Sequence, residues 1–99
     1  MKALVINGQK QTIELLDISS MDEIIDQVGF DSVIADELDS TNRIYFDEDC
    51  FLRGTEGRFR IDTLPPIAGV GVVLGSSETG VLADVTLTLD EVRERVSFL

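Results

Sequence analysis

The chain has 99 residues, 43% of them hydrophobic, and a formal charge of −11 at pH 7. We expect one domain, residues 1–99, built around a single core. No apolar run approaches the roughly 18 residues that a bilayer-spanning helix needs, and the first residues lack the pattern of a signal peptide. Cys50 is the only cysteine, which fits a reducing compartment, so we expect a cytoplasmic protein.

The first segment, residues 2–16, predicts a β-hairpin. The pair Asn7-Gly8 readily supplies the positive φ angles of a tight reversal. The sequence does not decide whether the turn has two or four residues. Both lengths place the same side chains on the buried face of the hairpin, so that face is predicted even though the strand register is not. That face carries Leu4, Ile6, Ile13 and Leu15.

Residues 21–28 are predicted to form a short amphipathic helix. Ser20 and Glu23 have the spacing of a capping box, and Gly29 ends the pattern. Apolar residues recur with helical spacing at Met21, Ile24, Ile25 and Val28. Residues 31–38 and 43–46 then predict two strands joined by the polar tetrad of residues 39–42.

Residues 46–57 are a turn-rich connector. The next segment, residues 58–62, predicts a half-buried strand with Phe59 and Ile61 inside and Arg58 and Arg60 outside. Pro65-Pro66 prevents a continuous helix or central strand through the junction that follows.

The stretch "IAGVGVVLGSSETG", residues 67–80, is rich in glycine and invites comparison with phosphate-binding loops. It lacks the lysine of a Walker loop, and its glycines have the spacing G-x-G-x-x-x-G, which is not the dinucleotide fingerprint. We therefore predict a buried, central strand from Val70 to Leu74, followed by a turn. Gly69 and Gly71 should share a face that another element approaches closely.

The last segment predicts a strand and then a helix. Val85, Leu87 and Leu89 are in phase for a strand over residues 81–89. Thr88 and Glu91 form a second capping box, with a hydrophobic staple between Leu87 and Val92. The final helix should begin near Leu89 and present Leu89, Val92 and Val96 to the core, with Arg93 and Arg95 at its negative end.

Together these elements predict an α+β fold, a mostly antiparallel sheet of five to seven short strands with two short amphipathic helices packed on it. A mixed sheet is the alternative, because the connection through the first helix allows parallel neighbours.

The negative charge is concentrated in one part of the sequence. Between residues 22 and 49 there are ten carboxylates and one base, Arg43. Such a surface repels nucleic acid and anionic membranes, so we expect no direct binding to either and predict a protein partner with a basic surface. The candidate partner-binding residues are Asp22, Glu23, Asp26, Asp36, Glu37, Asp39, Asp47, Glu48 and Asp49. As an alternative, Arg53, Arg58 and Arg60 could hold the phosphate of a small ligand or nucleotide.

Residue types that carry most catalysis are scarce. The chain has no histidine, which excludes the Ser-His and Cys-His nucleophile pairs and any zinc site that uses imidazole. Asp47 and Asp49 match the start of a calcium loop, but Phe51 stands where the third ligand belongs. Cys50 is best read as a small, half-buried apolar residue. We expect no metal, no cofactor, no catalytic residues and no enzymatic activity.

Four segments carry a resemblance to a known family: "KALVI", "YFDEDCFLRG", "IAGVGVVLG" and "TLTLDEV". On these segments the chain resembles a small family of phage, plasmid and bacterial proteins known as domain of unknown function 3846. It departs from the family pattern between Gly57 and Pro66 and at Gly71. The resemblance implies a phage or mobile-element setting and carries over no catalytic residue. With the charge pattern, it predicts a non-catalytic accessory factor that masks a basic nucleic-acid-binding surface on its partner.

Overall fold

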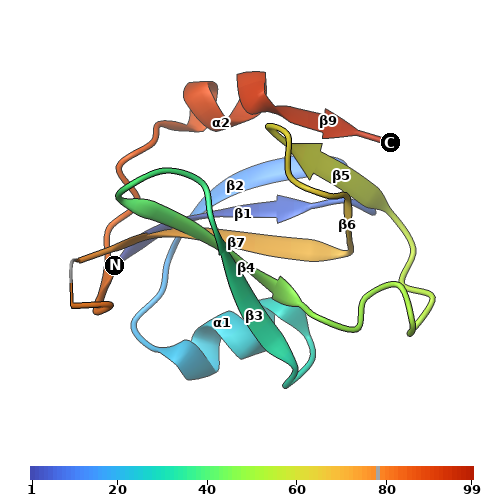
Figure 1. Cartoon of the computed structure of the whole chain (residues 1–99), viewed down its shortest axis with the longest axis horizontal. Helices are drawn as coiled ribbons and strands as arrows, with labels where there is room; N and C mark the ends of the chain where they lie inside the picture. The colour runs from blue at the N-terminus through green and yellow to red at the C-terminus, as the bar shows by residue number, and fades with distance from the viewer. Residues whose placement is uncertain (78) are drawn as a thin grey trace.

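The computed structural model describes every residue except 78, and its described residues form two helices and nine strands (Figure 1). The elements are β1 (Lys2–Asn7), β2 (Thr12–Asp17), α1 (Met21–Val28), β3 (Val33–Glu37), β4 (Asn42–Asp47), β5 (Arg58–Ile61), β6 (Ile67–Ala68), β7 (Val70–Ser76), β8 (Leu82–Ala83), α2 (Leu89–Arg95) and β9 (Val96–Phe98).

The strands form two sheets. The larger has six strands in the order β2-β1-β7-β4-β3, with β8 paired to the end of β7. The smaller has the order β6-β5-β9. All strand pairs among the described residues are antiparallel, so the predicted α+β class is confirmed and the mixed sheet is not formed there. The second sheet is not predicted by the sequence, because its strands have only two to four residues each.

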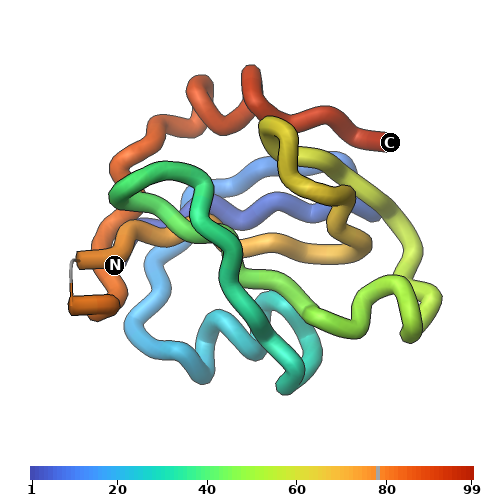
Figure 2. Tube along the Cα trace, in the orientation of Figure 1, coloured from blue at the N-terminus to red at the C-terminus, as the bar shows by residue number. Residues whose placement is uncertain are grey.

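The large sheet is the middle of three layers. On one face α1 contributes Ile24 and Val28 to a cluster with residues of β1, β4 and β7. On the other face Phe59 and Ile61 of β5 and Val92 of α2 pack against the same three strands. Figure 2 shows α1 on one side of the large sheet, and β5, β9 and α2 on the other. Strands β1, β4 and β7 are therefore buried on both faces.

The β1–β2 hairpin settles the open register. Asn7 pairs with Thr12, which leaves a loop of four residues, and the Asn7 side chain accepts hydrogen bonds from the backbone N–H groups of Gln9 and Lys10. The four predicted residues do share a face, but their burial differs. Because β2 is the edge of the sheet, Leu15 is 54% exposed, while β1 also buries its opposite face.

Helix α1 begins and ends where the sequence predicts. The hydroxyl of Ser20 accepts the N–H of Glu23, and Gly29 takes a left-handed conformation with φ of 93°. The Glu23 carboxylate binds Ser19 instead of completing the capping box on Ser20. Met21, predicted to face the core, is 44% exposed because it lies at the first position of the helix.

The glycine-rich stretch contains the central strand of the large sheet, β7, as predicted. Gly71 lies where a Cβ atom would approach Phe59 at 2.8 Å and Ile44 at 2.9 Å, so the small sheet packs closely there. Gly69 does not belong to the same strand face. Its φ of 86° turns the chain out of β6 in one sheet and into β7 in the other. Of the predicted turn after the strand, residue 78 lies outside the described residues.

The last quarter of the chain differs most from the prediction. Only Leu82 and Ala83 of the predicted strand 81–89 pair in a sheet, although Val85, Leu87 and Leu89 all pack against the cluster below α2. The capping box of Thr88 and Glu91 is present in full. Helix α2 ends at Arg95, and Val96 begins strand β9 beside β5 instead of closing the helix.

Candidate interaction surface

The nine candidate acidic residues lie in three places. Those of α1 are on one side of the large sheet, those of residues 36–39 surround the β3–β4 turn, and those of residues 47–49 lie where β4 enters the connector. The turn and the connector are at opposite ends of β4, whose six residues span about 20 Å. The acidic run of the sequence therefore does not fold into one continuous patch.

Asp47 is a structural residue. It is only 3% exposed, and its carboxylate accepts hydrogen bonds from the Ser32 hydroxyl at 2.5 Å, the Asp49 backbone at 3.0 Å and Arg53 Nε at 2.8 Å. Burial raises the pKa of Asp47, but these hydrogen bonds lower it by more, so the pKa lies below its usual value. This network joins the connector to the loop between α1 and β3. Asp47 is thus not free to meet a partner.

Asp39 organises the β3–β4 turn. Its carboxylate accepts the backbone N–H groups of Thr41 and Asn42, both at 2.8 Å. Burial raises the pKa of Asp39, and the hydrogen bonds lower it by more, leaving the pKa below its usual value. Asn42, 1% exposed, then links the turn to Thr86 in the segment before α2. The turn is therefore held by its own side chains, Asp39 and Asn42, and by Thr86 in the segment before α2.

Two more of the candidate acids make local contacts. Glu23 binds Ser19, and the hydrogen bonds from the Ser19 side chain and backbone lower the pKa of Glu23. Glu37 lies 3.9 Å from Arg43 in an exposed ion pair that adds little stability. Within the part of the chain that the structure describes, the candidate acids whose side chains make no such contact are Asp22, Asp26, Asp36, Glu48 and Asp49.

The arginines of the alternative site are not equivalent. Arg53 binds Asp47 and Ser32 and lies over the ring of Phe30, 4.1 Å from its centroid. Arg58 lies over the exposed ring of Phe51 at 5.3 Å, and it shares the outer side of β5 with Arg60. Arg53 thus has a carboxylate already in place, and an anionic ligand would have to compete with Asp47 for it.

Charge is separated between the outer layers of the fold. The layer of α1 and its flanking loops, residues 18–32, carries four acids and no base. The opposite layer, residues 58–68 and 88–99, carries four acids and four arginines. The connector continues the negative layer, because the N–H of Glu48 binds the carbonyl of Ser32 at 2.8 Å. We call this surface the acidic side and define it by Asp22, Asp26, Asp31, Glu48 and Asp49.

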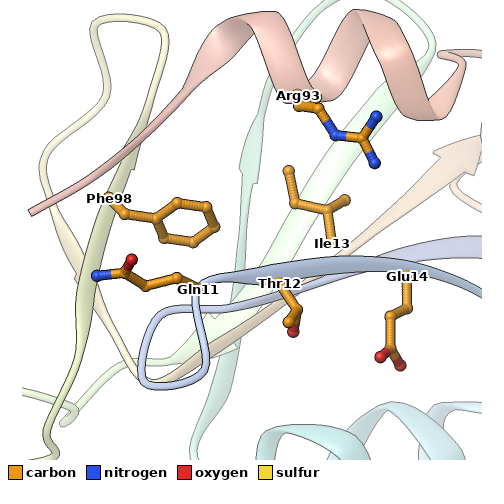
Figure 3. A pocket seen from close by; sticks show the side chains of 6 residues that line it. All are labelled: Gln11, Thr12, Ile13, Glu14, Arg93 and Phe98. Atoms are coloured by element: carbon orange, nitrogen blue, oxygen red, sulfur yellow. The ribbon is translucent and has the colours of Figure 1, made fainter.

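A groove of about 440 Å³ lies between β2 and the layer of α2 and β9 (Figure 3). Ile13 points into it between Arg93 and Phe98, whereas Thr12 and Glu14 point to the opposite side of β2. Gln11 completes its lining near Phe98. The sequence did not predict this groove, because one wall of the groove comes from β9, and the sequence pattern assigns the first residue of β9, Val96, to the final helix.

The remaining candidates are accounted for by packing. Cys50 is 3% exposed, so it is more deeply buried than predicted, and its sulfur accepts the Ala68 N–H at 3.5 Å. Among the described residues, acidic side chains and cysteine do not gather in the groups of three that could hold a metal ion. Neither helix in the described part of the chain has the length and apolar character needed to cross a bilayer.

Comparison with known proteins adds no relative. Family models, curated proteins and solved structures all give no match to this chain.

Proposed function

We propose that the protein is a non-catalytic binding protein whose acidic side covers a basic surface of a partner protein. The observation that carries the proposal is the separation of charge: residues 18–32 carry four acids and no base of their own, with Arg53 of the connector in contact with Ser32 and Phe30, while the α2 layer is balanced. A surface of one sign attracts an oppositely charged surface, increases the rate of association and repels partners of its own sign.

The chemistry of the partner follows from the carboxylates. Asp26, Asp31 and Glu48 are exposed, and their side chains take part in no hydrogen bond or ion pair found among the described residues. Repeated carboxylates of this kind can occupy a cationic groove that otherwise binds phosphates. A nucleic-acid-binding protein is therefore the partner we propose, and the phage or mobile-element setting implied by the resemblance above belongs to the same proposal.

Binding of a small anion through Arg53, Arg58 and Arg60 has weaker support. The ion pair of Arg53 with Asp47 is part of the network that holds the connector. An anion that took Arg53 away would leave the buried Asp47 without its cation, at a cost of about 2 kcal/mol, because Arg53 is partly exposed to water.

The test is recovery of partners from a cell lysate with the tagged protein at low and at high salt. Three double variants each remove two charges and differ in place. Asp26→Asn with Glu48→Gln changes the acidic side, Asp36→Asn with Glu37→Gln changes the β3–β4 turn, and Asp90→Asn with Glu94→Gln changes the balanced layer.

We expect the wild type to recover a protein with a basic, nucleic-acid-binding surface, and high salt to release it. The acidic-side variant should lose that protein, and the balanced-layer variant should retain it. Equal loss from all three variants would reduce the effect to total charge and contradict the proposal. Capture that resists both salt and the acidic-side substitutions would contradict it as well.

A further inference from the structure

The outer edge of β2 is open. In the large sheet β2 pairs with β1 on one side and is the last strand on the other. In an antiparallel sheet alternate residues of an edge strand direct their N–H and C=O groups outward, where they can pair with another chain. Natural edges are commonly blocked by proline, lysine or a bulge. The six residues of β2, TIELLD, contain neither proline nor lysine, and all six pair with β1 in continuous register.

The side of this edge that faces α2 presents Ile13 and Leu15, with the exposed Asp17 at the end of the strand. Leu15 is 54% exposed on that side, next to the groove into which Ile13 points. Phe98 and the helix residue Arg93 form the opposite wall (Figure 3). The charge of Arg93 is countered by Asp90 at 3.3 Å. A strand added beside β2 would place every second side chain beside Ile13 and Leu15 on this side.

The other side of the edge is negative. Glu14 points away from the groove, toward the α1 side of the sheet (Figure 3). The alternate side chains of an added strand would lie beside Glu14, where lysine or arginine is favoured as the cross-strand neighbour.

We propose that β2 binds an extended segment of a partner protein by strand addition, and that this segment alternates aliphatic with basic residues. The inference rests on the proposed function and names how the basic partner is held. Backbone hydrogen bonds supply affinity in this mode, and the alternate side chains supply specificity. A second copy of the chain fits poorly, because two β2 strands side by side would bring Glu14 and Asp17 of both copies together between molecules of charge −11.

The probe is a capped, labelled peptide of alternating valine and lysine, about eight residues long, so that it covers the six of β2. A peptide with the same residues in two blocks is the control for charge and composition. A peptide of alternating valine and glutamate is the control for sign. We expect the first to bind at low salt, and the two controls to bind at least about tenfold more weakly.

Two protein variants locate the site. Leu15→Lys places a charge on the side of β2 that faces α2, and Ile34→Lys makes the same change on the same face at the other edge of the sheet, in β3. Leu15→Lys should weaken binding of the valine–lysine peptide about tenfold, and Ile34→Lys should leave it within about twofold. Amide hydrogen exchange should slow at alternate residues of β2 in the wild-type complex.

Equal binding of the block peptide, or equal effects of the two variants, would overturn the inference. A dimer of the free protein that Leu15→Lys dissociates would overturn it in favour of a second copy. If the valine–lysine peptide does not bind, but the acidic-side substitutions still abolish recovery of the partner from lysate, strand addition is wrong and the proposed function is retained. If the peptide binds as expected while acidic-side substitutions leave capture unchanged, the proposed function is the part that fails.

Discussion

Asp47→Asn replaces the buried carboxylate at the end of β4 with an amide of the same shape. The oxygen that remains can still accept from the Ser32 hydroxyl and the Asp49 backbone. The new NH₂ group, however, replaces the oxygen that lies 2.8 Å from Arg53 Nε, so two donors face each other. The substitution therefore removes one hydrogen bond between charged groups and leaves the other two in place.

A hydrogen bond to a charged group contributes about 1.5–3 kcal/mol. The lower part of that range applies here, because the Arg53 side chain is 37% exposed and water can replace its lost acceptor. We expect the free energy of unfolding to fall by about 2 kcal/mol and the melting temperature by roughly 8–16 °C for a chain of this size.

The measurement is urea unfolding followed by circular dichroism, with Asp49→Asn as the matched control. Asp49 is also an acid of the candidate set, lies two residues away and is half-buried, and its hydrogen bonds to Asp47 and Arg53 involve its backbone N–H and C=O. The control should stay within about 0.5 kcal/mol of the wild type. A similarly small loss of unfolding free energy for Asp47→Asn would refute the structural role of this carboxylate and make Asp47 a candidate partner-binding residue again.

The same carboxylate predicts a dependence on pH. Its pKa is lowered in the folded protein, so its stabilising effect is present above the unfolded pKa of about 3.9 and is lost as the pH falls through the lower folded value. The difference in unfolding free energy between wild type and Asp47→Asn should therefore be constant near neutral pH and shrink below about pH 4. A difference that grows in acid would contradict this assignment.

Substitutions at three further positions test the packing and capping of the fold. Gly71→Ala forces a Cβ to within 2.8 Å of Phe59 and should cost about 1–3 kcal/mol in urea unfolding. Asn42→Ala removes the buried amide that binds Thr86 at 2.6 Å, so thermal unfolding should show a loss of about 2 kcal/mol. Thr88→Ala should lower stability by about 1 kcal/mol, and Thr88→Ser should restore most of it, because the hydroxyl caps α2.

Local chemistry explains how much of the fold the sequence predicted. The cap residues Ser20 and Thr88 and the terminal Gly29 located the starts of both helices and the end of the first, since capping depends on a few neighbouring residues. Val70 to Leu74 is an almost unbroken apolar run and correctly indicated a strand buried on both faces. The short strands β6 and β9 were missed because two or three residues carry no periodicity, and the strand predicted over residues 81–89 forms only at Leu82 and Ala83, in β8.

The candidate interaction surface, like the fold, was only partly predictable from the sequence. The sequence by itself determined the total charge, the crowding of acids before residue 50 and the lack of histidine. Only the tertiary structure decided that Asp47 is buried in a network with Arg53, while Glu48, the next residue, is exposed. Likewise, Leu15 has the pattern of a core residue, but the sheet order leaves it at an open edge beside a groove. Burial and strand order depend on contacts between distant segments, which local patterns do not encode.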